Sequence, residues 1–202
     1  MKIALKSLVI AVAAVALLAG CAKPPTQELA AAKAAIDAGV AMQAPVYAPE
    51  ELAKVKKDLA GAEAEIKVQE EKFWKNFDNA KAMIVKVTAD AEAIKAAIPA
   101  RKEAAKKAAI EAEAAAKVAL EEAKALLAKA PKGKGTRADI EAFAADLKGV
   151  EDAMPQVAAK IAGEDFFGAS DSANSLKAKA MSVSEQINAA IEKAKPAGKK
   201  KK

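Results

Sequence analysis

The sequence predicts an all-α protein, an elongated antiparallel helical bundle or coiled coil. Much of its 53% apolar content is alanine, aromatic residues make up only 3%, and glutamate and lysine fill most other positions. Alanine is the best helix former, and this composition suits long, closely packed helices rather than a thick globular core. Apolar residues also recur at helical spacing, whereas strand alternation appears nowhere at useful length. We therefore expect helices alone.

Four segments carry apolar residues at alternating steps of three and four, which places each set on one face of a helix, as in an a/d seam. The four stripes are Leu52, Val55, Leu59, Ala62 and Ile66; Ile84, Val87, Ala91, Ile94 and Ile98; Ile140, Phe143, Leu147, Val150, Met154, Val157 and Ile161; and Ala173, Leu176, Ala180, Val183, Ile187 and Ala190. Upstream of them, the alanine-rich stretch "LAAAKAAI" from Leu29 predicts a further helix.

Helix-breaking residues divide the first half of the chain. Pro45 and Pro49 bracket a short loop, and Pro49 followed by two glutamates is typical of a helix start. The next turn is expected around Asn76, Asp78 and Asn79, where no glycine fixes its place.

The second half is divided less evenly. "APKGKGTRAD" from Ala130 reads as a linker, and Gly163 can end a helix before the apolar stripe that begins at Phe166. Pro99 and Pro155 lie inside strong helical patterns without a capping residue before them, so we interpret both as kinks rather than breaks. The long helix between the two halves is expected over residues 77–130.

The segments repeat. The stripe from Leu52 maps onto the one from Ile140 with an offset of 88 residues, and the stripe from Ile84 maps onto the one from Ala173 with an offset of 89. A rival register with an offset of 93 differs by one helical turn and keeps the same buried face. The simplest account is two three-helix units that share one long helix. The expected organisation is a signal peptide at 1–20, a lipidated linker at 21–26, helical unit 1 at 27–98, a helical connector at 99–117, helical unit 2 at 118–195 and a Lys-rich tail at 196–202.

The first residues have the layout of a bacterial secretory signal peptide. Lys2 and Lys6 are followed by an apolar run at 8–18, too short to span a membrane, and then by small residues. Leu18-Ala19-Gly20-Cys21 resembles the lipobox of bacterial lipoproteins, which implies a diacylglyceryl group on Cys21 and cleavage just before it. Ala22 after the cysteine implies the outer membrane, with the protein facing the periplasm. The alternative is an ordinary signal peptide with a chance cysteine.

Charge and composition bound the chemistry. The formal net charge is +6, but two positive charges belong to the predicted signal peptide and four to the last four residues, so the body is neutral. That argues against nucleic-acid binding, which needs a clustered basic surface. The chain has no histidine, so histidine-based triads and metal sites are excluded. Carboxylates alternate with lysines as on a solvated face, and "GKGT" at Gly133 lacks the order of a phosphate-binding loop. We expect no enzyme, cofactor or metal.

Aromatic residues gather at two predicted turns, with Phe73, Trp74 and Phe77 at the first and Phe166 and Phe167 at the corresponding place in unit 2. They are either core residues that plug bundle ends which alanine cannot fill, or a surface that contacts a partner protein or the bilayer interface. Apolar residues at helical spacing are usually core, which favours the plug.

The chain ends in a lysine run, Lys199, Lys200, Lys201 and Lys202. Such a block is a solvated tail or contacts an anionic polymer of the envelope such as peptidoglycan. The lipobox, the helicity and the terminal Lys202 resemble Braun-type lipoproteins, whose last lysine is joined covalently to peptidoglycan. Greater length, a repeated body and a lysine run set this chain apart from them.

"AAIDAGVAMQAPVYAPEELAKVKKDLAGAEAEI" from Ala34 resembles a family of bacterial lipoproteins known as domain of unknown function 4398. The shared pattern is an alanine-rich helix, a Tyr-Ala-Pro-Glu-Glu-Leu entry at 47–52 and a hairpin with an aromatic residue near its turn. The resemblance implies a location and a helical fold, with no activity.

Two functional hypotheses follow. The leading one is a lipid-anchored, non-enzymatic structural, scaffold or envelope-tethering protein, with lipid at Cys21 and the lysine tail at the other end. The alternative is a helical adapter or chaperone-like module that binds a partner protein or peptide. Self-association remains open in either case.

Overall fold

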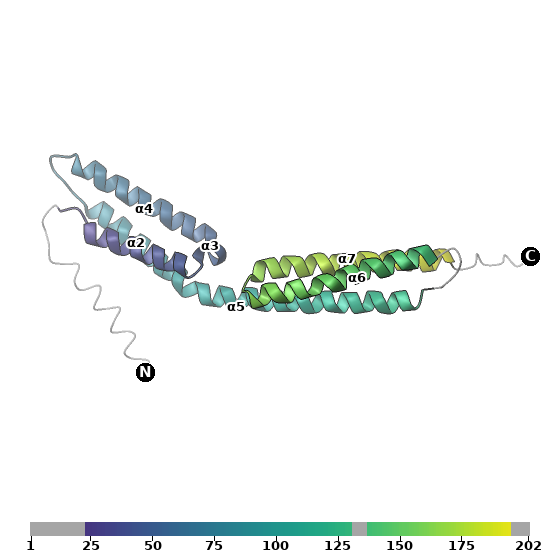
Figure 1. Ribbon diagram of the computed structural model, residues 1–202. Helices are drawn as coiled ribbons and strands as arrows, with labels where there is room; N and C mark the ends of the chain where they lie inside the picture. Colours follow the sequence, from purple (N-terminus) through teal and green to yellow (C-terminus); the bar gives the residue numbers. More distant parts are fainter. Residues whose placement is uncertain (1–22, 131–136, 195–202) are drawn as a thin grey trace, which may run out of the picture. The chain divides into compact units, whose positions relative to one another are not determined.

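A computed structural model describes residues 23–130 and 137–194, and all regular secondary structure in these ranges is helical (Figure 1). The prediction of an all-α helical bundle is confirmed. The helices are α2 (Thr26–Ala41), α3 (Ala44–Tyr47), α4 (Pro49–Glu70), α5 (Asp78–Ala128), α6 (Arg137–Ala162) and α7 (Phe166–Ala194). The described residues form two compact units, which divide between Pro99 and Ala100, and α5 contributes to both.

Unit 1 consists of α2, α3, α4 and the first part of α5. Ion pairs show which of its helices are neighbours. Lys33 of α2 pairs with Glu63 of α4 at 2.6 Å, and Asp58 of α4 pairs with Lys86 of α5 at 3.1 Å. All three long helices contribute to a gap in the core too small for water, which is lined by Ala35, Ile36, Gly39, Leu52, Val55, Ala91 and Ile94. The predicted stripes therefore face each other across a packed interior.

Unit 2 consists of the rest of α5 with α6 and α7. Lys124 of α5 pairs with Glu151 of α6 at 2.9 Å, and Lys160 of α6 donates a hydrogen bond to Ser172 Oγ of α7 at 2.7 Å. The buried residues from the three helices are Ala109, Ala116, Ala119, Leu120, Ala123, Leu147, Val150, Met154, Val157, Phe166, Ala169, Ala173, Ala180, Val183 and Ile187. Alanine supplies about half of this core, as the composition predicts.

The stretch at 99–117, expected as a helical connector, is helical and continues α5. Ala109 and Ala116 within it are completely buried, so these residues also contribute to the core of unit 2. Pro99 in α5 and Pro155 in α6 both lie inside continuous helices, so neither proline breaks its helix.

The two units correspond residue by residue. Helices α4 and α6 begin 88 positions apart, and so do α5 and α7. Buried residues match at an offset of 89 in the pairs Phe77 and Phe166, Ala80 and Ala169, Ile84 and Ala173, Ala91 and Ala180, Ile94 and Val183, and Ile98 and Ile187. The rival offset of 93 would pair buried Phe77 with Ser170 and buried Ile84 with Lys177, neither of which is buried. The structure therefore favours the offset of 89.

Two connections differ from the sequence-based expectation. The turn after α4 spans 71–77, so Asp78 and Asn79 lie in the first turn of α5 rather than in the loop. Helix α6 ends at Ala162, directly before Gly163, and the left-handed residue is Glu164, with φ of 63°. The N–H groups of Glu164 and Asp165 return to the carbonyls of Ile161 and Lys160, the pattern of a Schellman cap.

Candidate functional site

The five aromatic residues singled out from the sequence divide into two groups. Phe77 is 3% exposed and Phe166 is 4% exposed, so both are core residues and the plug interpretation is confirmed for them. They are not available as partner contacts. Phe73 is 90% exposed and Trp74 is 85% exposed, so neither side chain plugs the end of the bundle, while Phe167 is half exposed.

Phe73 and Trp74 form the most exposed apolar surface among the described residues. Their ring centroids lie 5.4 Å apart with an interplanar angle of 88°, an edge-to-face pair. No other large apolar side chain in the described ranges exceeds 66% exposure, the value for Val85. Isolated exposed apolar residues need no explanation, but two adjacent aromatic rings held almost entirely in water make this pair a candidate contact surface.

Side-chain hydrogen bonds hold the loop that carries these rings. Gln69, buried at the end of α4, donates from Nε2 to Glu65 Oε1 at 2.7 Å and accepts at Oε1 from the Asn76 N–H at 3.4 Å. Asn76 Oδ1 accepts from the N–H of Asp78 at 2.8 Å, which satisfies a free donor at the start of α5. With Phe77 buried next to Asn76, the loop is fastened at both ends and residues 73 and 74 project outward.

The sequence pattern does not predict that the side chains of Gln69 and Asn76 hold this loop. A signal existed for Gln69, because it lies three residues after Ile66 on the buried stripe of α4, where a polar residue needs a partner. Asn76 was placed in the turn, but its role in capping α5 depends on where that helix begins.

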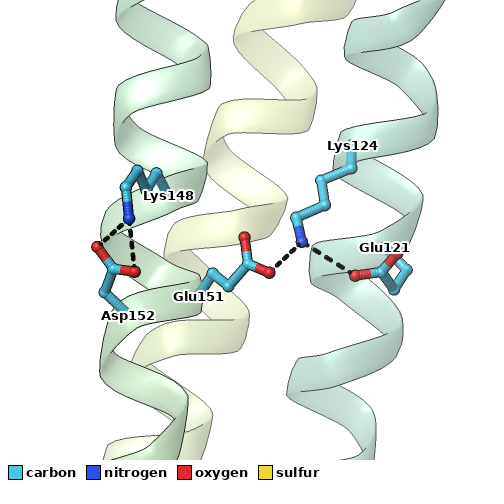
Figure 2. Close-up of polar contacts among 5 residues, drawn as sticks. All are labelled: Glu121, Lys124, Lys148, Glu151 and Asp152. Atoms are coloured by element: carbon cyan, nitrogen blue, oxygen red, sulfur yellow. Dashed lines mark hydrogen bonds and ion pairs between the residues drawn. The ribbon is translucent and has the colours of Figure 1, made fainter.

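A second feature is an open groove of about 700 Å³ in unit 2, between α5 and α6. It is lined by Lys124, Leu127, Ala144, Leu147, Lys148, Glu151, Asp152 and Pro155. Figure 2 shows its charged side chains engaged with one another. Lys124 bridges Glu151 at 2.9 Å and Glu121 at 3.2 Å, while Lys148 binds both carboxylate oxygens of Asp152, at 2.8 and 2.7 Å.

These ion pairs set the protonation of the groove. The hydrogen bond from Lys124 to Glu151 raises the pKa of Lys124 above its usual value, and the hydrogen bond to Glu121 adds to this effect. The hydrogen bond to Asp152 raises the pKa of Lys148 in the same way. Both ammonium groups therefore stay charged at neutral pH, when a nucleophilic or basic lysine must be uncharged. The groove has the properties of a solvated interhelical ion-pair network, as the alternating charges predict.

Within residues 23–130 and 137–194, no group of three or more aspartate, glutamate, cysteine or histidine side chains is arranged to hold a metal ion. None of the helices described in those ranges combines the length and the apolar character that crossing a membrane requires.

The features at the two ends of the chain, Cys21 and the lysines Lys199, Lys200, Lys201 and Lys202, lie outside the described residues, and so does the "GKGT" segment from Gly133. What the sequence predicts for them stays a prediction.

Comparison with known proteins adds no relative. No protein-family model, no curated protein and no solved structure matches this chain. The resemblance to the family known as domain of unknown function 4398, and the likeness of the chain ends to bacterial lipoproteins, therefore stay predictions from the sequence.

Proposed function

We propose that this chain is a lipid-anchored lipoprotein of the outer membrane that faces the periplasm and acts as a non-enzymatic structural, scaffold or envelope-tethering protein. The observation that carries the proposal is Leu18-Ala19-Gly20-Cys21, placed directly after a positive start and a short apolar run. Two or more long acyl chains hold a protein to a bilayer far more firmly than one, since each buried CH₂ contributes about 0.8 kcal/mol.

The helical body supports a spacing role. Helix α5 has 51 residues, of which 78–99 belong to unit 1 and 100–128 to unit 2, so one continuous helix links the two units. The charged side chains of the groove neutralise each other, Lys124 with Glu151 across two helices and Lys148 with Asp152 within α6. Such a body holds two attachment points apart without chemistry of its own.

The lysine run at 199–202 supplies the second attachment point in this proposal. Four consecutive ammonium groups attract an anionic polymer such as peptidoglycan, and the contact weakens with salt because exposed charges are screened. Lipid at one end and cell wall at the other would make the protein a tether.

Radiolabelled fatty acid and membrane fractionation test the anchor. The wild-type chain is expected to take up label and to sediment with outer membranes, whereas Cys21→Ser takes up none and becomes soluble in the periplasm. Ala22→Ser, the neighbouring position, serves as the matched control and should behave like wild type in labelling. A Cys21→Ser chain that still sediments with membranes and carries label would refute the anchor.

Peptidoglycan sedimentation tests the tether. Replacing the four lysines at 199–202 with glutamine should abolish co-sedimentation of the chain with purified peptidoglycan. The same number of Lys→Gln changes at exposed positions of α4, Lys54, Lys56, Lys57 and Lys67, should have little effect. Equal loss in the two variants would show that the tail has no special role.

A second candidate function is a helical adapter, and the groove of unit 2 favours it. The groove combines an apolar floor, from Leu127 and Leu147, with charged walls, the usual make-up of a surface that takes an amphipathic helix. A photo-crosslinker at Ala144 in the groove should capture one stoichiometric polypeptide if the protein is an adapter. No polypeptide captured at Ala144, together with cell-wall fragments captured by a second crosslinker at Lys200, would favour the tether.

A further inference from the structure

The exposed aromatic pair lies at the end of unit 1 where α2 begins. Helices α2 and α4 run antiparallel, with Lys33 paired to Glu63. Thr26 is seven residues before Lys33 and Glu70 is seven residues after Glu63, so the start of α2 is level with the end of α4. Figure 1 shows the start of α2 and the connection from α4 to α5 at the same end of this unit.

Cys21 lies only five residues before Thr26. Five residues of extended chain reach at most about 18 Å. If Cys21 carries the lipid, as the proposed function requires, the bilayer surface lies within that distance of the end of unit 1 that carries the aromatic loop. Phe73 and Trp74 then lie on the end of unit 1 that is nearest to Cys21 along the chain.

We propose that the loop at 71–77 is a second membrane contact, in which the rings of Phe73 and Trp74 enter the boundary between lipid headgroups and acyl chains. Tryptophan favours this boundary because its large apolar ring carries one N–H that can reach a polar partner. A single weak contact of this kind does not hold a protein on a bilayer, but it adds to a lipid anchor placed a few residues away. Two points of contact fix which end of unit 1 faces the membrane.

The charges around the loop explain what kind of lipid surface it fits. Three acidic and three basic side chains flank the aromatic pair: Glu70, Glu71 and Asp78 against Lys72, Lys75 and Lys81. With these charges balanced, attraction to anionic lipids is small and the contact depends on the rings. The lysines beside the rings have long apolar stems that let their ammonium groups remain among the headgroups.

The hydrogen bonds at the ends of the loop lower the entropy cost of the contact. Gln69, Asn76 and buried Phe77 already fix both ends of the turn, so its backbone loses little freedom when the rings enter the bilayer. The rings themselves touch edge to face and enter as a pair.

Trp74 is the only tryptophan of the chain, so tryptophan fluorescence reports on this loop alone. We would reconstitute the lipidated full chain in vesicles of phosphatidylethanolamine and phosphatidylglycerol. Emission should shift to the blue, resist quenching by acrylamide in the water, and be quenched by lipids brominated near the headgroup. Accessibility to acrylamide equal to that of a tryptophan in unit 2, made by Phe167→Trp in a Trp74→Phe chain, overturns the proposal.

A Cys21→Ser chain that begins at residue 21, without the apolar run at 8–18, separates the loop from the anchor. Added to vesicles, it should partition weakly, and Trp74→Ala or Phe73→Ala should reduce the partition coefficient about tenfold or more. Replacing Lys72 and Lys75 with glutamine should change partitioning far less than either ring deletion. Both rings are exposed, so these variants should keep the circular dichroism spectrum of wild type.

The outcomes distinguish the two proposals. Partitioning that depends on Trp74, in a chain whose Cys21 takes up no fatty acid, supports the loop and refutes the anchor. A labelled Cys21 combined with a water-exposed Trp74 overturns only the loop. Shielding of Trp74 that appears with envelope protein and never with vesicles also overturns the loop, because the occupant is then a protein.

Discussion

The substitution Phe77→Ala tests whether one aromatic cluster holds two kinds of residue. Phe77 is 3% exposed at the start of α5, and removing its ring deletes a buried side chain and leaves a cavity. Phe→Ala changes in cores cost about 3–5 kcal/mol, of which the transfer of the ring from water accounts for about 1.5–3 and the cavity for much of the rest. Phe73, four residues earlier and 90% exposed, provides the matched control, because exposed substitutions stay within about 0.5 kcal/mol.

Urea denaturation measures the difference. At an m-value of roughly 2 kcal/mol per molar, the loss for Phe77→Ala lowers the midpoint of unfolding by about 1.5–2.5 M, whereas Phe73→Ala leaves it nearly unchanged. Far-ultraviolet circular dichroism follows the unfolding of the described helices. Equal destabilisation by both variants would refute the division of the cluster into core and surface residues.

Three further changes have expected outcomes. Gln43, at φ of 70°, is in the left-handed region, so Gln43→Gly should raise the free energy of unfolding by about 0.5–1 kcal/mol in thermal or urea melts, whereas Gln43→Ala should not. Gly149→Ala in α6 should stabilise by about 0.5–1 kcal/mol, because the nearest atom to the added Cβ is Lys179 Nζ at 3.9 Å; a loss would mean that the helices pack more closely there than described. The hydrogen bond from Lys86 lowers the pKa of Asp90 in the folded chain. The ionised carboxylate therefore stabilises the fold above about pH 4, the pKa of an aspartate in the unfolded chain. This stabilisation is lost as the pH falls through the lower pKa of the folded chain. Asp90→Asn should therefore lower the urea midpoint at pH 7 and matter less at about pH 3; the same deficit at both pH values would exclude the ion pair as its cause.

The fold could be predicted because the alanine-rich stripes leave few alternatives. Steps of three and four place Leu52, Val55 and Ala62 on one face, and all three are buried in α4. A face of that kind is stable only against similar faces. The repeat of this stripe at an offset of 88 predicts the corresponding helix of the second unit.

The exposed pair could not be predicted, because the same period continues through the turn. After Ile66, the spacing proceeds without interruption through Gln69, Phe73 and Phe77 to Ala80. A single helix from α4 into α5 would satisfy this pattern and bury Phe73. The chain turns instead because α4 and α5 pack against each other, a contact between residues distant in sequence such as Asp58 and Lys86. Periodicity carries no information about that contact, and the position of Phe73 depends on it.

The alanine seam reverses the usual sensitivity of a protein core to mutation. In most cores, truncation of large side chains does the damage, and enlargement is the rarer fault. Here truncation can remove only a methyl group at five completely buried positions, Ala32, Ala62, Ala80, Ala109 and Ala116. A valine or leucine at any of them must force helix axes apart over several turns, at a cost of about 1–3 kcal/mol. Natural variation along this seam should therefore be restricted to glycine, alanine and serine, while the few large core residues exchange freely among aliphatic types.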